Sequence, residues 1–320
     1  MDSSCPKYWL DAPGKGDPYF IAISASNLPL FIAGIILNGG LLFLMRKFTK
    51  TRLDRVMQLL LAVHLGWSLF EVLRYTVSMF YGPQLFWRVV AMGTWMGLIT
   101  IFAANMSLSF ERCFFVMFSS MPDYERTTRK YFVALAVWVL ALYATIIAVF
   151  TTSCASRLLF PTNRLQRVIW TATVGSSGVA IMFLTIVLNI YTYFHVKRAI
   201  QTSLGLGATK DLQQKVLMRC IIMSSSLVIM YSPLITFMGV TLVSYLGDSV
   251  YRSFRIVSYF LMALDAVVTP GLMIYLHKEV RMTVMDCWRW WCGKKRLESD
   301  EGTLVRSLSI ESEHGSENSL

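Results

Sequence analysis

Long runs of apolar residues, broken by short polar segments, fill the chain between Pro18 and Leu276. A helix needs about 20 apolar residues to cross the hydrocarbon core of a bilayer, because each residue advances it by about 1.5 Å. The runs therefore predict an all-α membrane protein, a bundle of seven transmembrane helices. The expected helices are Pro18–Met45, Val56–Phe80, Phe86–Phe118, Tyr131–Ser153, Val168–Val196, Lys215–Tyr245 and Phe254–Leu276.

Polar segments flank this bundle, which we assign to residues 18–277. Residues 1–17 predict a short extracellular tail. Residues 278–292 combine basic side chains with tryptophans, a pattern typical of an amphipathic helix on the inner membrane surface. Residues 293–320 are acidic and rich in serine, which predicts a disordered cytoplasmic tail.

Composition and charge agree with a membrane protein and orient it. The chain is 55% hydrophobic and only 15% charged, which is too little charge for the wetted surface of a soluble domain. Its net charge of +11 lies mainly in the short segments between apolar runs, so we expect no nucleic-acid partner. Lysine and arginine crowd the segment between the first two expected helices. This side is therefore cytoplasmic, and we expect a multi-pass plasma-membrane protein with an extracellular N-terminus and a cytoplasmic C-terminus.

Short motifs occur in a fixed order along the expected helices. They are Asn38 in the first, Glu111-Arg112-Cys113 at the inner end of the third, Trp138 in the fourth, Tyr191 in the fifth, Met230-Tyr231-Ser232-Pro233 in the sixth and Thr269-Pro270-Gly271-Leu272-Met273 in the seventh. In order and spacing they resemble the motifs of the rhodopsin-like (class A) G-protein-coupled receptors, over about Pro29 to Cys292. The resemblance implies a receptor that passes an extracellular signal to a heterotrimeric G protein and is then bound by an arrestin-like protein.

The chain also departs from that family's pattern. The segment around His64 lacks the family's helix-two aspartate, and Thr269 and Met273 replace the asparagine and tyrosine of helix seven. No cysteine lies at the outer end of the third helix, so Cys154 is left to pair with Cys5 or to stay free. The seventh helix has no lysine that would hold retinal as a Schiff base, so we expect no covalent cofactor.

The resemblance makes Arg112 part of the floor of a G-protein pocket. At rest its guanidinium pairs with the adjacent Glu111, and on activation it approaches Tyr191. Pro233 removes a helix hydrogen bond and bends the sixth helix, and Pro270 belongs to the corresponding motif of the seventh. The family's restraining acid on helix six is absent, which predicts activity without ligand. The plainer alternatives are an arginine that anchors its helix at the membrane edge and an ordinary structural bend.

Asp265 is a carboxylate within the seventh expected helix, where a charge costs roughly 2.5 to 3.5 kcal/mol. It should therefore face the bundle and have a partner. We hypothesise a site for a sodium ion or a proton, formed with Asn38, Asn105 or His64, in the layer where the resemblance places the family's sodium ion. The alternative is a protonated or hydrogen-bonded structural acid.

Glu71 and Arg74 share one face of the second helix, toward its outer half, and can pair. The resemblance places Tyr231 at the position of the family's ligand-sensing tryptophan. The outer segments also carry further arginines, among them Arg157, Arg164 and Arg167. Their positive charge predicts an anionic ligand such as a carboxylate, a phosphate or an acidic lipid, with contact to lipid headgroups as the alternative.

Cys287 and Cys292 are predicted palmitoylation sites at the membrane edge, or else free thiols. The tail offers phosphate acceptors for an arrestin-like protein at Ser307, Ser309 and Ser312. The six cysteines form no metal-ligand cluster and no nucleophile lies beside a base, so we expect neither a metal nor enzymatic activity.

Two other functions are weighed against the receptor. A seven-helix channel or transporter would use a polar path around Asp265 and would carry current without a G protein. The lack of an internal repeat disfavours the transporter folds built from duplicated halves. An intramembrane enzyme is disfavoured, because the sequence lacks paired catalytic acids and a histidine-rich metal set.

Overall fold

The structure is a computed structural model, and nearly every residue that it describes is helical. It describes residues 18–46, 52–78, 84–118, 124–152, 164–202, 222, 225–236, 248–276 and 278–291. The predicted tails at residues 1–17 and 293–320 lie outside these ranges.

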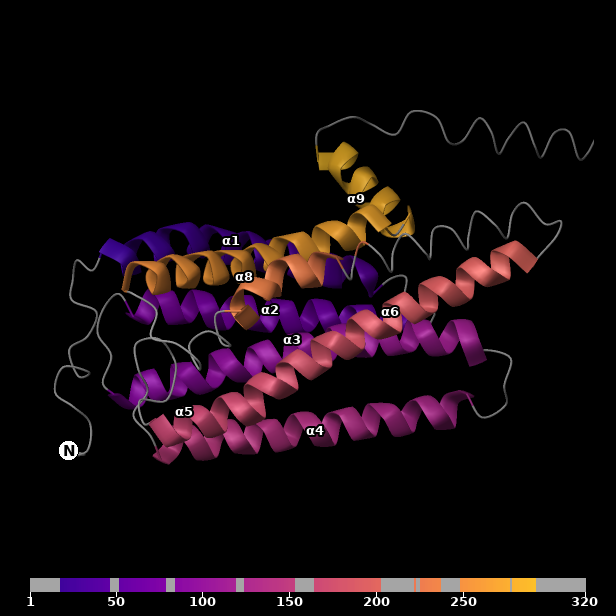
Figure 1. The fold of residues 1–320 in the computed structure, drawn as a ribbon. Helices are drawn as coiled ribbons and strands as arrows, with labels where there is room; N and C mark the ends of the chain where they lie inside the picture. Colours follow the sequence, from indigo (N-terminus) through magenta and orange to yellow (C-terminus); the bar gives the residue numbers. More distant parts are fainter. Residues whose placement is uncertain are drawn as a thin grey trace, which may run out of the picture. The chain divides into compact units, whose positions relative to one another are not determined.

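The helices follow the apolar runs closely (Figure 1). They are α1 (Pro18–Met45), α2 (Arg52–Ser78), α3 (Gln84–Phe118), α4 (Tyr124–Thr152), α5 (Arg164–Trp170), α6 (Ser176–Thr202), α8 (Asp248–Leu276) and α9 (Lys278–Trp291). A π-helical turn, η2 (Thr171–Gly175), joins α5 to α6, so that the expected fifth helix is continuous.

Six of the helical stretches are long and apolar enough to cross a membrane. They are Ala22–Met45, Arg52–Thr76, Arg88–Phe115, Glu125–Thr152, Val168–Arg198 and Ile256–Leu276. Of the sixth expected helix the structure describes mainly the shorter apolar helix Ser225–Thr236. The chain is therefore an all-α, multi-pass membrane protein, and the count of seven crossings stays a prediction.

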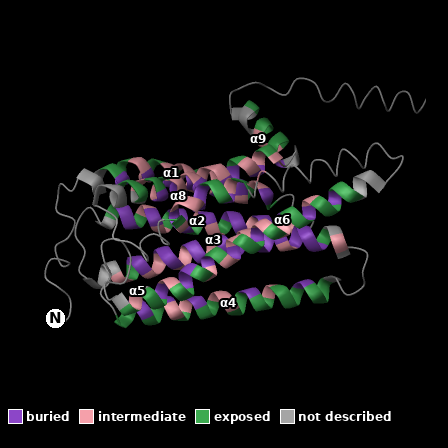
Figure 2. Ribbon diagram, viewed as in Figure 1, coloured by how far each residue is buried: buried purple, intermediate pink, exposed green. Residues whose placement is uncertain are grey.

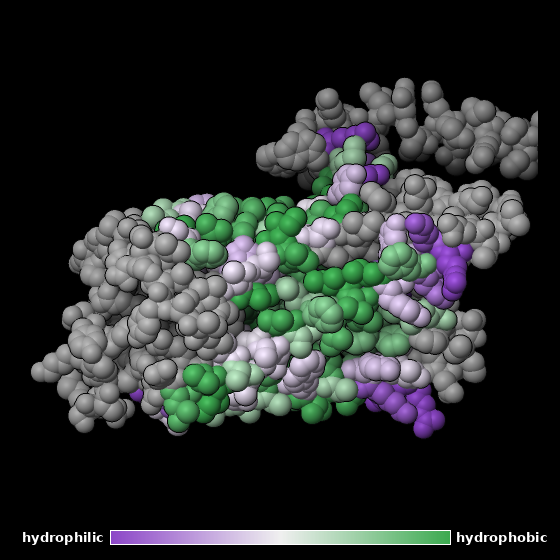
Figure 3. Space-filling model, in the orientation of Figure 1, coloured by the Kyte–Doolittle hydropathy of each residue, from purple (hydrophilic) through white to green (hydrophobic). Residues whose placement is uncertain are grey.

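α3 is the central helix, in contact with α2, α4 and α6. It is buried along most of its length in Figure 2, whereas much of α4 is exposed. The exposed side chains of α4 are themselves apolar, for example Val133, Val137 and Leu140, which suits contact with lipid. In Figure 3 hydrophobic side chains cover the middle of the helices and hydrophilic ones gather near one end.

α1 approaches α2 and α8 closely at Gly34. A Cβ atom on Gly34 would lie 2.9 Å from the Cβ of Ala266 and 3.1 Å from the Oγ of Ser68, so only glycine fits without a shift. One turn further on, the Nδ2 of Asn38 donates to the carbonyl oxygens of Gly34, at 2.8 Å, and of Ala266, at 2.9 Å. Asn38 is thus a buried polar link between α1 and α8.

The end of α8 from Met273, together with α9, belongs to a second compact unit. α9 is a helix over Lys278–Trp291, and its Arg281, Met282, Asp286 and Arg289 are exposed. The Nη1 of Arg281 donates to the carbonyl oxygen of Tyr275 at 3.4 Å, which ties the first turn of α9 to the end of α8.

Candidate functional site

Asp265 on α8 is the centre of a buried polar cluster, and its side chain has partners on three elements. Its Oδ2 accepts a hydrogen bond from the hydroxyl of Tyr231, at 2.6 Å, on the Ser225–Thr236 helix. Its Oδ1 accepts one from the hydroxyl of Thr269, at 2.8 Å, one turn further along α8. The Nε2 of His64 on α2 lies 3.9 Å from Oδ2. We call Asp265, Tyr231, Thr269 and His64 the Asp265 cluster.

The burial of this cluster is nearly complete. His64 and Tyr231 are 0% exposed, Asp265 is 3% exposed and Thr269 5%. Neither ring nitrogen of His64 has a hydrogen-bond partner among the residues that the structure describes, and the same holds for the Oγ of Ser68, one turn along α2. Polar groups buried without partners are uncommon in proteins and often mark functional positions.

The hypothesis of an ion or proton site named three possible partners for Asp265, and their positions differ. His64 lies beside the carboxylate, as described above. Asn38 bonds to the carbonyl of Ala266, the next residue of α8. The Nδ2 of Asn105 instead donates within its own helix, to the carbonyl of Ile101 at 3.0 Å.

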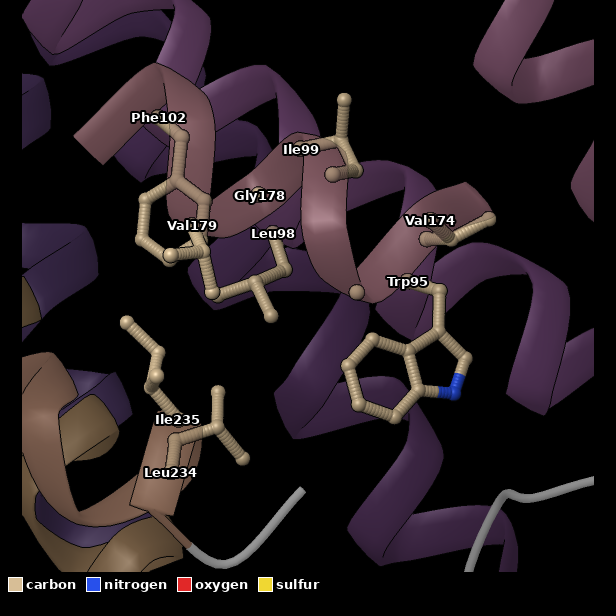
Figure 4. Close-up of a pocket in the computed structure, with 10 residues that line it drawn as sticks. Trp95, Leu98, Ile99, Phe102, Val174, Gly178, Val179, Leu234 and Ile235 are labelled. Carbon is tan, nitrogen blue, oxygen red and sulfur yellow. The ribbon is translucent and has the colours of Figure 1, made fainter. Parts of the chain in front are cut away.

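An apolar pocket lies next to the cluster, between α3, the η2–α6 segment and the Ser225–Thr236 helix. Its free volume is about 20 Å³, roughly the room that one water molecule needs, so side chains must move before a larger molecule can enter. Figure 4 shows its side chains facing one another from these elements. The lining residues are Trp95, Leu98, Ile99, Phe102, Val174, Gly175, Gly178, Val179, Leu234 and Ile235.

Phe102 connects this pocket to the Asp265 cluster. Its ring meets the ring of Tyr231 edge to face, with the centroids 4.8 Å apart. Leu234 and Ile235, which also line the pocket, follow Tyr231 within one turn of the same helix. A molecule in the pocket would therefore touch Phe102, which packs on the ring of Tyr231, the donor of the hydrogen bond to Asp265.

The π-helical turn η2 supplies Val174 and Gly175 to the pocket wall. Just before this turn, Trp170 is fully buried and packs edge-on against Trp95 of α3, with the ring centroids 4.5 Å apart. Isolated π turns inside α-helices are frequently found at functional sites. No sequence pattern marks this turn, because its residues form part of one apolar run.

Glu71 and Arg74 do pair, as their spacing predicted. The Nε of Arg74 lies 2.7 Å from the Oε2 of Glu71, and the Oε1 of Glu71 accepts a hydrogen bond from Thr94 of α3 at 3.1 Å. The guanidinium also lies 4.1 Å from the ring centroid of Tyr75 and 5.8 Å from that of Tyr259 on α8. With Glu71 1% and Arg74 7% exposed, this is a buried and internally neutralised pair.

At the other end of α3, Glu111 has a partner on another helix. The Nε of Arg52 on α2 lies 3.1 Å from the Oε2 of Glu111, whose side chain is only 2% exposed. The same guanidinium lies 5.3 Å from the ring centroid of Phe132 on α4. Arg112 is 7% exposed, so both charged residues of the motif face into the bundle.

Tyr191 lies on the outer surface of α6. Its side chain is 54% exposed, and its ring stacks on that of His195 with the centroids 6.4 Å apart. The residue of α6 that faces α3 is Asn189, whose Nδ2 donates to the Oγ of Ser109 at 3.0 Å. Sequence reasoning missed Asn189, although an asparagine within an apolar run was a usable signal.

The proline of the sixth expected helix, Pro233, is half-buried two residues after Tyr231. Pro270 is buried within α8, directly after Thr269. The two helices that share the Tyr231–Asp265 hydrogen bond therefore each contain a proline near it.

Several predicted site residues lie outside the described side chains. Arg164 and Arg167 belong to α5 and Cys287 to α9, but the structure describes only their place in the helix. Outside the described ranges altogether are Arg157, Cys292, Ser307, Ser309 and Ser312.

The arrangement of side chains offers binding and conformational coupling. Within the described ranges, no three His, Cys, Asp or Glu side chains gather as metal ligands would. No protein-family model matches the chain, and no curated protein matches it either.

Proposed function

We propose that this chain is a seven-helix receptor of the rhodopsin-like, class A type that couples an extracellular ligand to a heterotrimeric G protein at the plasma membrane. The observation that carries the proposal is the line of contacts from the apolar pocket through Phe102 and Tyr231 to Asp265. These contacts join a binding space to two proline-containing helices inside a membrane bundle. The order of the sequence motifs supports the same proposal.

Ligand entry would act first on Phe102, which lines the pocket and packs against Tyr231. A shift of Tyr231 weakens its 2.6 Å hydrogen bond to Asp265, which joins the Ser225–Thr236 helix to α8. Pro233 has no N–H for the helix ladder, so its helix bends there at low cost. A small displacement at the pocket is thereby converted into a larger movement of the helix ends.

The response would be delivered at Glu111 and Arg112, ten residues beyond Phe102 or about 15 Å along α3. Arg52 holds Glu111 at 3.1 Å and so fastens α2 to α3. In the proposed mechanism, release of this contact frees the inner ends of the helices to admit a G protein. Ligand binding shifts an existing equilibrium between closed and open states.

The pocket lining favours a ligand with an apolar body, because every lining residue is apolar or glycine. Arg74, one of the cations predicted to hold an anionic group, is neutralised by Glu71. Of the anionic ligands predicted from the sequence, an acidic lipid matches this apolar lining better than a small inorganic anion does.

A channel or transporter is the second candidate, and one observation favours it. His64 is fully buried next to Asp265 without a hydrogen-bond partner in the described part of the chain, as expected for a group on a proton path. Such a protein would carry current that depends on Asp265 and would not need a G protein.

The test is G-protein activation in cells, without added ligand, across a panel of Gα subunits. The proposal expects a basal signal that Arg112→Ala abolishes at equal surface expression. Arg46→Ala, which removes an exposed arginine at the end of α1, is the matched control and should keep the signal. An equal signal in all three proteins would remove Arg112 from the mechanism. Silence with an Asp265-dependent current would favour the channel.

A further inference from the structure

One oxygen of Asp265 has neighbours on two different helices. Its Oδ2 accepts the hydroxyl of Tyr231 at 2.6 Å, and the Nε2 of His64 lies 3.9 Å from the same atom. The first contact belongs to the Ser225–Thr236 helix and the second to α2. The Oδ1 atom is engaged separately, by Thr269 of the same helix as Asp265. A change at Oδ2 therefore alters how α8 is held to its neighbours.

His64 is the group within this arrangement whose hydrogen-bonding needs are unmet. It is 0% exposed, and neither nitrogen has a hydrogen-bond partner among the described residues. A buried N–H without a partner is costly, and a small approach toward Oδ2 would satisfy it. An imidazolium gains more from this approach than a neutral imidazole does, because its full positive charge then faces the carboxylate.

We propose that His64 is a proton-binding site, and that protonation makes it a second donor to Oδ2 of Asp265, in competition with Tyr231. One proton from water adds to the imidazole, and the imidazolium then donates to the carboxylate. The Tyr231 hydroxyl then shares its acceptor with a charged donor, which weakens its hydrogen bond, and no covalent bond between heavy atoms changes. The proton thus fastens α2 to α8 and loosens α8 from the Ser225–Thr236 helix.

Few titratable side chains lie near His64 in the part of the chain that the structure describes. Asp265 faces it from α8, and Tyr231 meets the same oxygen from the Ser225–Thr236 helix. The described part of α1 has no titratable side chain between residues 22 and 45, and α3 has none between Arg88 and Glu111. On α2 itself the nearest acid toward the outer end is Glu71, about 10 Å along the helix and paired with Arg74. Asp265 is therefore the carboxylate that decides whether His64 holds its proton.

The proton and the pocket act on the same side chain. Tyr231 packs on Phe102, which lines the pocket, so a proton that weakens the Tyr231–Asp265 hydrogen bond and a molecule that moves Phe102 are energetically linked. Such linkage is reciprocal between two binding events. Proton binding at His64 goes beyond G-protein coupling and stands whether or not the chain is a receptor.

The experiment is a histidine NMR titration of the full-length chain in phospholipid nanodiscs, from about pH 4 to 8, so that it also covers pH values below the usual histidine range, because His64 is fully buried. The chain has four histidines, and His64→Gln assigns the signal of interest. We expect His64 to titrate in this range in the wild type. Asp265→Asn should move the midpoint down by about one pH unit or more, because it removes the charge that stabilises the imidazolium. Tyr231→Phe should move it up, because it removes the competitor for Oδ2.

A histidine with a purely structural role would not show titration midpoints that move in opposite directions in Asp265→Asn and Tyr231→Phe. His195→Gln, at an exposed position of α6, is the control and should leave the His64 titration unchanged. If His64→Gln fails to fold, replacing each of the other three histidines assigns the signal by elimination. A His64 signal that does not titrate, or that moves the same way in both variants, overturns the proposal.

Discussion

Glu71 and Arg74 form an ion pair between positions i and i+3 of α2, and Asp286 and Arg289 form another on α9. In the sequence the two pairs look alike. In the structure the first has side chains 2% and 7% exposed, and the second 53% and 60% exposed. Water screens the exposed pair, so its contribution is at most a few tenths of a kcal/mol. The buried pair is different, because each charge depends on the other for its solvation.

Glu71→Ala is therefore expected to destabilise the protein by about 3 to 5 kcal/mol, because it leaves the Arg74 guanidinium buried and uncompensated. The measurement is the thermal unfolding of purified protein in detergent. Asp286→Ala, the matched change in the exposed pair, should leave the unfolding temperature nearly unchanged.

The double variant Glu71→Gln, Arg74→Met removes both charges of the pair. It therefore distinguishes the cost of an unpaired buried charge from the loss of the pair itself. It should recover much of the stability, since no unpaired charge is left inside the bundle. If Glu71→Ala unfolds at the same temperature as Asp286→Ala, Arg74 finds another counterion and the pair does not hold α2 in place.

At the residue scale, the sequence predicted the pairing of near neighbours but few contacts between distant residues, among them the approach of His64 to Asp265. The spacing of Glu71 and Arg74 fixes one helix face, so their pairing followed from the sequence. The bond from Asn189 to Ser109 joins residues 80 apart, and that from Tyr231 to Asp265 joins residues 34 apart. No local pattern encodes these pairs, because they depend on how the helices are rotated against one another.

At the scale of elements, the apolar runs predicted where the helices lie but not which way they face. α1 coincides with its expected bounds, whereas α4 begins at Tyr124, seven residues before the expected Tyr131. The helix continues through charged residues because they leave the hydrocarbon and meet water. Lipid is as apolar as a protein core, so periodicity does not separate the lipid face from the packed face. This is why the outward position of Tyr191 did not follow from the sequence.

The contact between Arg52 and Glu111 fastens the first turn of α2 to the last part of α3. If the receptor proposal holds, Arg52→Ala should raise G-protein activation without ligand. Arg52 is 30% exposed, so the contact is worth about 1 kcal/mol, which corresponds to a roughly five-fold shift in a two-state equilibrium. The readout is the basal signal per receptor at the cell surface.

Arg55→Ala is the control for this prediction, since Arg55 lies on the same helix and is exposed. It removes the same charge from the same end of the bundle without touching Glu111. Equal basal signals from Arg52→Ala and Arg55→Ala would show that net charge, and not the link between α2 and α3, sets the resting state.

For the whole molecule, the number of membrane crossings decides on which sides the two ends of the chain lie. Exposed basic residues occur at the end of α1, at the start of α4 and near the end of α6: Arg46, Arg126, Arg129, Lys130, Lys197 and Arg198. With six crossings alternating through the bilayer, all of these positions fall on one side, which the positive-inside rule assigns to the cytoplasm.

Whether the helix Ser225–Thr236 belongs to a membrane crossing then determines on which side of the membrane α8 ends. If it belongs to a crossing, α8 starts outside and ends in the cytoplasm, and the basic α9 lies on the cytoplasmic side with the other positive segments. If it does not cross, α8 ends outside the cell, and the basic residues of α9 lie on the extracellular side, against the positive-inside rule. Its buried Tyr231, bonded to Asp265 in the bundle interior, favours the crossing.

We therefore expect an epitope tag at the N-terminus to bind antibody on intact cells, and a tag at the C-terminus to bind only after permeabilisation. A tag inserted between α1 and α2, within residues 47–51, is the internal control and should behave like the C-terminal tag. Detection of both end tags on intact cells would mean an even number of crossings. It would exclude the seven-helix receptor, because the motif at Arg112 and the tail after α9 would then face opposite sides of the membrane.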